Sequence, residues 1–68
     1  MDKYFDKRVR IIDVDGKTWI GLVVSYEPPE DSENGKWWLD VKVENIKDFG
    51  ELTICEDEIK KIQEISNN

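Results

Sequence analysis

Apolar and polar residues alternate along most of this chain, and short polar segments interrupt the alternation. Residues 9–14 are rich in β-branched side chains, residues 18–26 alternate over a long run, and residues 36–44 alternate again. Leu52 and Ile54 begin a further alternating segment. A period of two residues is typical of half-buried strands. The pattern therefore predicts four strands.

The segments between these strands carry residues that favour turns. Asp15-Gly16 separates the first two strands, Asn34-Gly35 follows two prolines and precedes the third, and Gly50 precedes the fourth. Asp-Gly and Asn-Gly next to apolar runs are strong turn signals. Gly21 interrupts one face of the second strand, where glycine permits a sharp bend or a close approach of two backbones, as in small barrels.

The last apolar segment, residues 59–65, fits two different elements. Its isoleucines recur every three residues, which suits one stripe of a helix. Four bent strands alone would leave exposed edges, however, and closure of the sheet would remove them. We therefore predict a one-turn connection at residues 56–58 and a fifth strand at residues 59–65, with the helix as the alternative.

These elements predict a single all-β domain over residues 1–65: a five-stranded, strongly bent antiparallel barrel. A short N-terminal helix is expected to precede the first strand, with Asp2 as its cap and Tyr4 and Phe5 as its apolar contacts. The tail, residues 66–68, is expected to fray.

Composition narrows the classes of function. The 68 residues include 16 acidic and 10 basic side chains, one cysteine and no histidine. No internal disulfide, metal-ligand cluster or nucleophile beside a base is evident, so we expect no enzyme, no metal and no cofactor. The longest apolar run, residues 22–24, is too short to span a membrane. With a lone thiol and no signal-peptide pattern, a cytoplasmic location is expected.

Three sequence features together resemble a known family. They are "KRVRI" at residues 7–11, "DGKTWIG" at residues 15–21, and a short turn between Ile54 and Ile59. The chain resembles the Sm-like (LSm) family of small barrels from about residue 4 to residue 65. Gly16 and Gly21 are similar to the glycines of that family's first motif, and Ile54 and Ile59 to the isoleucines of its second. Another SH3-like barrel is the alternative.

The resemblance implies self-association. Sm-like subunits pair into rings through their fourth and fifth strands, which implies a subunit edge at Leu52, Ile54, Ile59 and Ile62. A chain this short buries only ~60% of its extended surface, so association would also add stability. The expected partner is therefore the chain itself, as a ring or another homo-oligomer, and the expected role is a non-enzymatic scaffold or an atypical RNA-associated protein.

The family's RNA pocket is not preserved. Where Sm-type proteins have an Arg-Gly-Asn turn, this chain has Cys55-Glu56-Asp57, and Glu27 is the only acidic equivalent after the second strand. Carboxylates repel phosphate, and the net charge is −6. RNA binding is thus expected to be weak, with phosphate contacts at Lys7, Arg8 and Arg10. Simple solvation of these basic residues is the alternative.

The aromatic residues predict a surface for a protein partner. Alternation places Trp37 in the core with Leu39 and Val41, and places Trp38 and Trp19 on the outer face. The predicted partner-binding surface contains Trp19, Trp38 and Tyr26, and ordinary packing is the alternative. The rival hypothesis for the whole chain is a monomeric SH3-like module that binds a protein through Trp19, Trp38 and the acidic loop at residues 27–35, either as an adaptor or as an acidic inhibitor or immunity-type protein.

Overall fold

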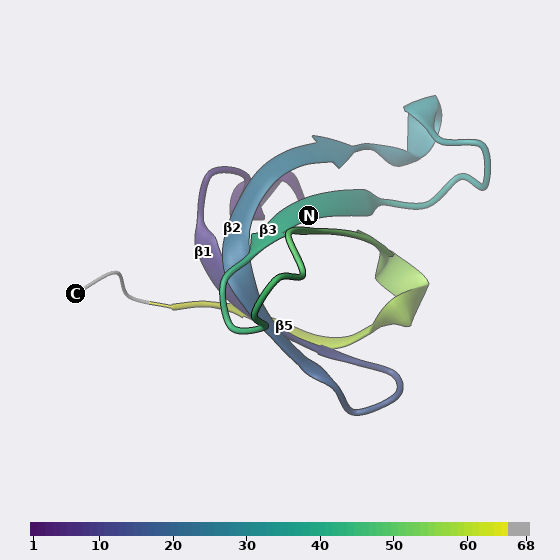
Figure 1. Ribbon diagram of the computed structural model, residues 1–68. Helices are drawn as coiled ribbons and strands as arrows, with labels where there is room; N and C mark the ends of the chain where they lie inside the picture. The colour runs from purple at the N-terminus through teal and green to yellow at the C-terminus, as the bar shows by residue number, and fades with distance from the viewer. Residues whose placement is uncertain (66–68) are drawn as a thin grey trace.

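The computed structural model describes residues 1–65 and shows an all-β chain. Five antiparallel strands form one sheet in the order β4-β3-β2-β1-β5 (Figure 1). The strands are β1 (Arg8–Asp13), β2 (Thr18–Glu27), β3 (Trp38–Val43), β4 (Glu51–Cys55) and β5 (Ile59–Glu64). Single 3-10 turns are η1 (Asp2–Tyr4), η2 (Pro29–Asp31) and η3 (Glu56–Glu58). The predicted fraying of residues 66–68 lies outside the described residues.

The ambiguous C-terminal segment forms a strand. Residues 56–58 make the predicted one-turn connection, and β5 pairs antiparallel with β1, so the helical alternative is wrong. The predicted N-terminal helix is only the single turn η1. Its N-cap is Met1 rather than Asp2, and no side chain caps it. Three residues are too few to form a stable α-helix without further packing.

The predicted closure of the sheet is not found. β4 pairs with β3, β5 pairs with β1, and these two strands form opposite ends of the sheet. They separate as they leave η3 (Figure 1). The physical reason is that the 3-10 turn redirects the chain from one side of the bent sheet to the other, whereas a tight hairpin would have paired the two strands.

Gly21 allows β2 and β3 to approach closely. A Cβ atom built on Gly21 would lie 2.1 Å from the backbone oxygen of Lys42, so no larger residue fits there. A register shift between Val23 and Ser25 further bends β2 against β3. The close approach predicted for Gly21 is therefore present.

The core lies on the concave side of the sheet, and its buried apolar residues come from β1 to β4: Val9, Ile11, Trp19, Val23, Leu39, Val41, Val43, Ile54 and Cys55. The prediction for Leu39 and Val41 is confirmed. The prediction for Trp19 is wrong, because its side chain is 7% exposed. Both faces of β2 carry apolar residues. Because Gly21 has no side chain, the face that carries Trp19 and Val23 looks less apolar in the sequence than the opposite face, although it is the buried one. Trp37, predicted as core, is only half-buried.

Candidate interaction surfaces

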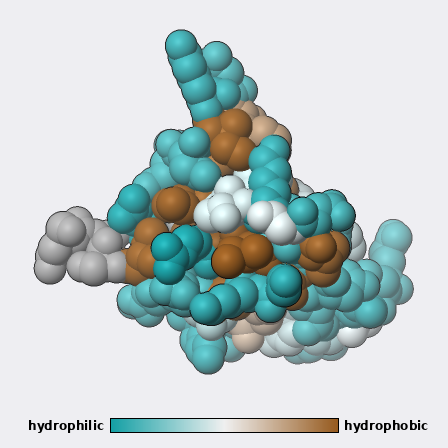
Figure 2. All heavy atoms as spheres, turned by 90° about the horizontal axis from the view of Figure 1, so that it is seen from below, coloured by the Kyte–Doolittle hydropathy of each residue, from teal (hydrophilic) through white to brown (hydrophobic). Residues whose placement is uncertain are grey.

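The two outer strands of the sheet form the first candidate surface. Leu52 on β4 and Ile59 and Ile62 on β5 are half-buried and pack against the core. Ile54 was predicted to lie at the same edge, but it is 3% exposed and belongs to the core. Seen from below, apolar surface gathers toward the middle of the molecule and is ringed by hydrophilic side chains (Figure 2). The half-buried residues Leu52, Ile59 and Ile62 therefore keep part of their apolar surface accessible at these edges.

The hydrogen-bond pattern of the sheet shows which backbone N–H and C=O groups of β4 and β5 point away from their neighbouring strands. Glu56 N–H donates to the Trp37 carbonyl at 2.9 Å, so even-numbered residues of β4 face β3 and Glu51 and Thr53 face outward. Ile65 N–H donates to the Arg8 carbonyl at 2.9 Å. By the same alternation, Ile62 and Glu64 of β5 direct their backbone groups away from β1. Both edges therefore offer outward N–H and C=O groups.

The turn that connects these two strands is held by a side chain of its own and by Lys36 of the β2–β3 loop. Cys55 N–H donates to Glu58 Oε1 at 3.0 Å, and Lys36 Nζ lies 3.0 Å from Asp57 Oδ2. Hydrogen bonds from Cys55 and then Lys36 lower the pKa of Asp57. The side chains of the turn at residues 55–58 are therefore engaged by contacts within the chain.

The three residues of the predicted partner-binding surface lie in three separate environments. Trp19 is in the core, where its Nε1–H donates to Asp13 Oδ2 at 2.9 Å and its ring packs on Phe49 with centroids 4.8 Å apart. Lys17 Nζ lies 4.5 Å from the centroid of the same ring. Trp19 is therefore enclosed by its own chain and offers no surface to a partner.

Tyr26 lies at the other end of β2 in a partly exposed aromatic row. Its ring centroid is 5.6 Å from that of Phe5 and 5.8 Å from that of Trp37. Successive strand residues point to opposite faces, so the side chains of Tyr26 and its neighbour Glu27 lie on opposite faces of β2. The structure thus separates Tyr26 from Trp38, because Trp38 is the cross-strand partner of Glu27.

Trp38 lines a hollow at the end of β2 and β3. The hollow has a volume of about 440 Å³, and its lining residues are Glu27, Asp31, Glu33, Asn34 and Trp38. Trp38 Nε1–H donates to Asn34 Oδ1 at 3.0 Å. The sequence predicted Trp38 and, in the rival hypothesis, the acidic loop as part of a binding surface, but it did not single out Asp31, Glu33 and Asn34 within that loop. The signal available was the acid-rich loop that leads directly into the two tryptophans.

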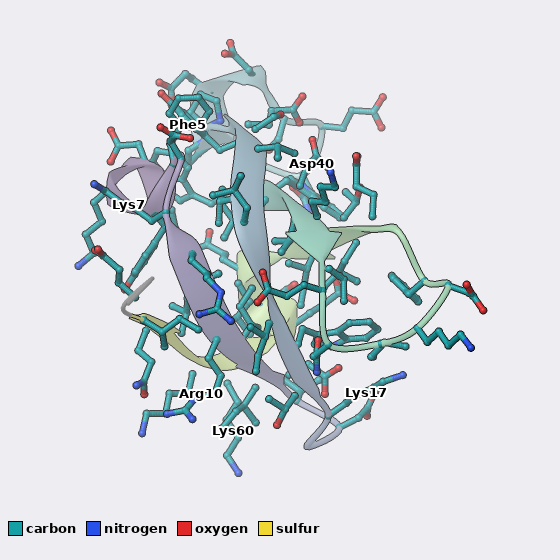
Figure 3. The ribbon with its side chains drawn as sticks, turned by 60° about the vertical axis from the view of Figure 1, so that its left-hand side comes forward. Phe5, Lys7, Arg10, Lys17, Asp40 and Lys60 are labelled. Atoms are coloured by element: carbon teal, nitrogen blue, oxygen red, sulfur yellow. The ribbon has the colours of Figure 1, made fainter. Side chains whose placement is uncertain are left out.

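The predicted phosphate-binding residues do not form a pocket. Arg8 Nε donates to Glu44 Oε1 at 2.7 Å, and this contact raises the pKa of Arg8 and lowers that of Glu44. Lys7 and Arg10 are exposed, and Figure 3 shows them at different positions along the sheet. Arg10 lies between Ile20 of β2 and Gln63 of β5 in the ladder. The basic group is therefore spread over one side of the sheet, and Glu44 already binds one member.

Two further properties concern the described residues as a whole. Residues 1–65 contain no helix that is long and apolar enough to cross a membrane. Within the same range, no group of three or more histidine, cysteine or acidic side chains is arranged to hold a metal ion.

Comparison with protein-family models, with curated proteins and with solved structures found no match to this chain. The resemblance to Sm-like proteins therefore rests on the sequence features alone.

Proposed function

We propose that this chain is a non-enzymatic, Sm-like module that associates with further copies of itself through β4 and β5 and acts as a scaffold. One observation carries the proposal. The two end strands of the sheet are both open on one side, and half-buried apolar residues lie beside each of them, Leu52 on β4 and Ile59 and Ile62 on β5.

Open strand edges favour pairing with another chain. Outward N–H and C=O groups, such as those of Thr53 on β4 and Ile62 on β5, are a template for a further strand. If β4 of one copy pairs with β5 of the next, the contact is head-to-tail, and a closed assembly satisfies both edges of every subunit. The same contact covers the half-buried apolar residues, which adds stability to a small domain.

RNA is a secondary partner in this proposal. The net charge of −6 opposes phosphate binding, Arg8 is engaged by Glu44, and the Cys55–Asp57 turn is held by internal contacts. Lys7 and Arg10 would contribute only when several copies bring them together in one assembly. We keep the cytoplasm as the proposed location, because the one thiol, Cys55, is buried and needs no oxidised partner.

The proposal is tested by the molar mass in solution, measured by light scattering after size exclusion at near-physiological salt. We expect a defined multiple of the 8.0 kDa chain. Thr53→Pro removes one outward N–H of β4 without breaking a bond to β3, so this variant should be monomeric and folded. Thr53→Ala is the matched control, since it also loses the 2.7 Å hydrogen bond to Asp40 but keeps its N–H. A monomeric wild-type chain would contradict the proposal and favour the SH3-like, protein-binding alternative.

A further inference from the structure

The hollow at Trp38 is not explained by self-association through β4 and β5. It lies where the long loop after β2 returns to β3, and Glu27 and Trp38 face each other across these two strands. The loop with η2 projects from the body of the molecule (Figure 1). The hollow is therefore accessible to a partner whether the chain is a monomer or an oligomer.

The aromatic wall of the hollow is fixed before any partner binds. Asn34 Oδ1 accepts the indole N–H of Trp38 at 3.0 Å and also the backbone N–H of Lys36 at 3.2 Å. The amide nitrogen of Asn34 lies 3.6 Å from the Sγ atom of the buried Cys55. These contacts tie the indole and the loop to β4. A wall that is already ordered lowers the entropy lost on binding.

The charge of the hollow defines what it can bind. Its carboxylates, Glu27, Asp31 and Glu33, form no ion pair with another described residue, and the nearby Lys36 pairs with Asp57 instead. Negative charge beside a half-buried indole attracts a cation and repels phosphate. Among residues 1–65, these carboxylates are not arranged to hold a metal ion. A larger, organic cation is the matching ligand.

We propose that this hollow receives an arginine side chain from an exposed basic segment of a partner protein. A guanidinium group is planar, so it can stack on the Trp38 indole while its N–H groups donate to several carboxylates at once. The ammonium of a lysine is a compact point charge and makes only one of these contacts well. This inference concerns a different surface from β4 and β5 and does not depend on the oligomeric state.

A titration followed by two-dimensional NMR tests the inference. The probe is the short capped peptide Gly-Ser-Arg-Ser-Gly, and its matched control carries citrulline, a neutral isostere, in place of arginine. We expect the arginine peptide to shift the Trp38 Nε1–H and Asn34 resonances and to leave that of the buried Trp19 Nε1–H unchanged. Equal shifts with the citrulline peptide would overturn the inference, as would tighter binding of the corresponding lysine peptide or of oligouridylate.

Variants of the same loop separate a site from a general charge effect. The double variant Asp31→Asn, Glu33→Gln should weaken binding of the arginine peptide by roughly tenfold or more, because it removes two charges that face the ligand. Trp38→Leu should also weaken it. Glu30→Gln is the control, since Glu30 is an exposed acid of this loop that does not line the hollow. An equal loss in Glu30→Gln would overturn the inference, because it would show attraction by the loop as a whole.

Discussion

The environments of Trp19 and Trp38 show how one residue type serves two purposes in a small domain. Both indoles donate an N–H to a side-chain oxygen, Trp19 to Asp13 at the end of β1 at 2.9 Å and Trp38 to Asn34 in the β2–β3 loop at 3.0 Å. Around Trp19, the remaining space is filled by Phe49 and by Lys17, whose charge lies over the ring. Around Trp38, a hollow remains, and its carboxylates have no cation from the described chain.

The difference shows that neighbours, rather than the tryptophan itself, decide between a structural and a binding role. At the Trp19 end, polar and charged groups are satisfied within the chain, so this end contributes stability. At the Trp38 end, three exposed carboxylates line the hollow and form no ion pair with another described residue, so they are available to a ligand. Substitutions at the two ends should therefore change different measured properties.

The largest expected effect comes from Trp19→Ala. Loss of a buried aromatic side chain from a core costs about 3–5 kcal/mol, which is comparable with the whole stability of a domain of this size. We expect the variant to be largely unfolded at 25 °C, as measured by circular dichroism during urea denaturation. Retention of the wild-type unfolding midpoint would show that Trp19 is not part of the core.

Gly21→Ala tests the close contact between the backbones of β2 and β3. The added Cβ would lie 2.1 Å from the carbonyl oxygen of Lys42, and backbone cannot move aside as a side chain can. We expect a loss of about 3 kcal/mol, at the upper end for overpacking. Gly35→Asn is the control, because Gly35 has open space around it and asparagine tolerates its positive φ. Similar unfolding midpoints for both variants would contradict the close approach of β2 and β3.

Lowering the pH should reduce the stability by a smaller amount, through protonation of Asp13 beside Trp19. Asp13 accepts N–H groups from Trp19, Lys17 and Asp15, and the bond from Trp19 is the main cause that lowers its pKa below the ordinary value of 3.8. Its contribution to stability is therefore complete above about pH 4 and is lost as pH falls through the lowered pKa. Urea midpoints measured from pH 6 to pH 2 should fall more steeply in wild type than in Asp13→Asn. Parallel curves would contradict this role, because Glu44 and Asp57 titrate alike in both proteins.

Trp38→Ala should have the smallest effect on stability. The indole is only half-buried and lies in the hollow, so we expect a loss of about 1 kcal/mol or less, measured by the same urea denaturation. Binding of the arginine peptide should nevertheless be lost. A destabilisation as large as that of Trp19→Ala would contradict the division between the two ends.

Much of the fold could be predicted from local patterns in the sequence. The β3 alternation of Leu39 and Val41 with charged residues marks the buried face without ambiguity. The short spacing between Ile54 and Ile59 left room for a single turn, although the isoleucine spacing after that turn also fitted a helix. β2 was harder, because apolar residues occupy both of its faces and Gly21 leaves a gap on the buried one. Alternation defines two faces, but it cannot state which one is buried when both are apolar.

The candidate site was less predictable because it depends on contacts across the chain. Arg8 reaches Glu44, and Asn34 reaches both Trp38 and Cys55, and nothing in the local sequence specifies these pairs. Closure of the sheet was also beyond local pattern, since the path of the chain through η3 determines whether β4 meets β5. The acid-rich loop was visible in the sequence, but its arrangement around Trp38 was not.

Amide hydrogen exchange at the sheet edges tests self-association most directly. It would be followed by NMR in dilute and in concentrated protein. If β4 of one copy pairs with β5 of the next, the outward N–H groups of Thr53 and Ile62 should exchange more slowly in the concentrated sample, while those of the β2–β3 loop exchange at the same rate in both. Exchange at Thr53 and Ile62 that is equally fast at both concentrations would contradict association through these strands, even if the molar mass showed an oligomer.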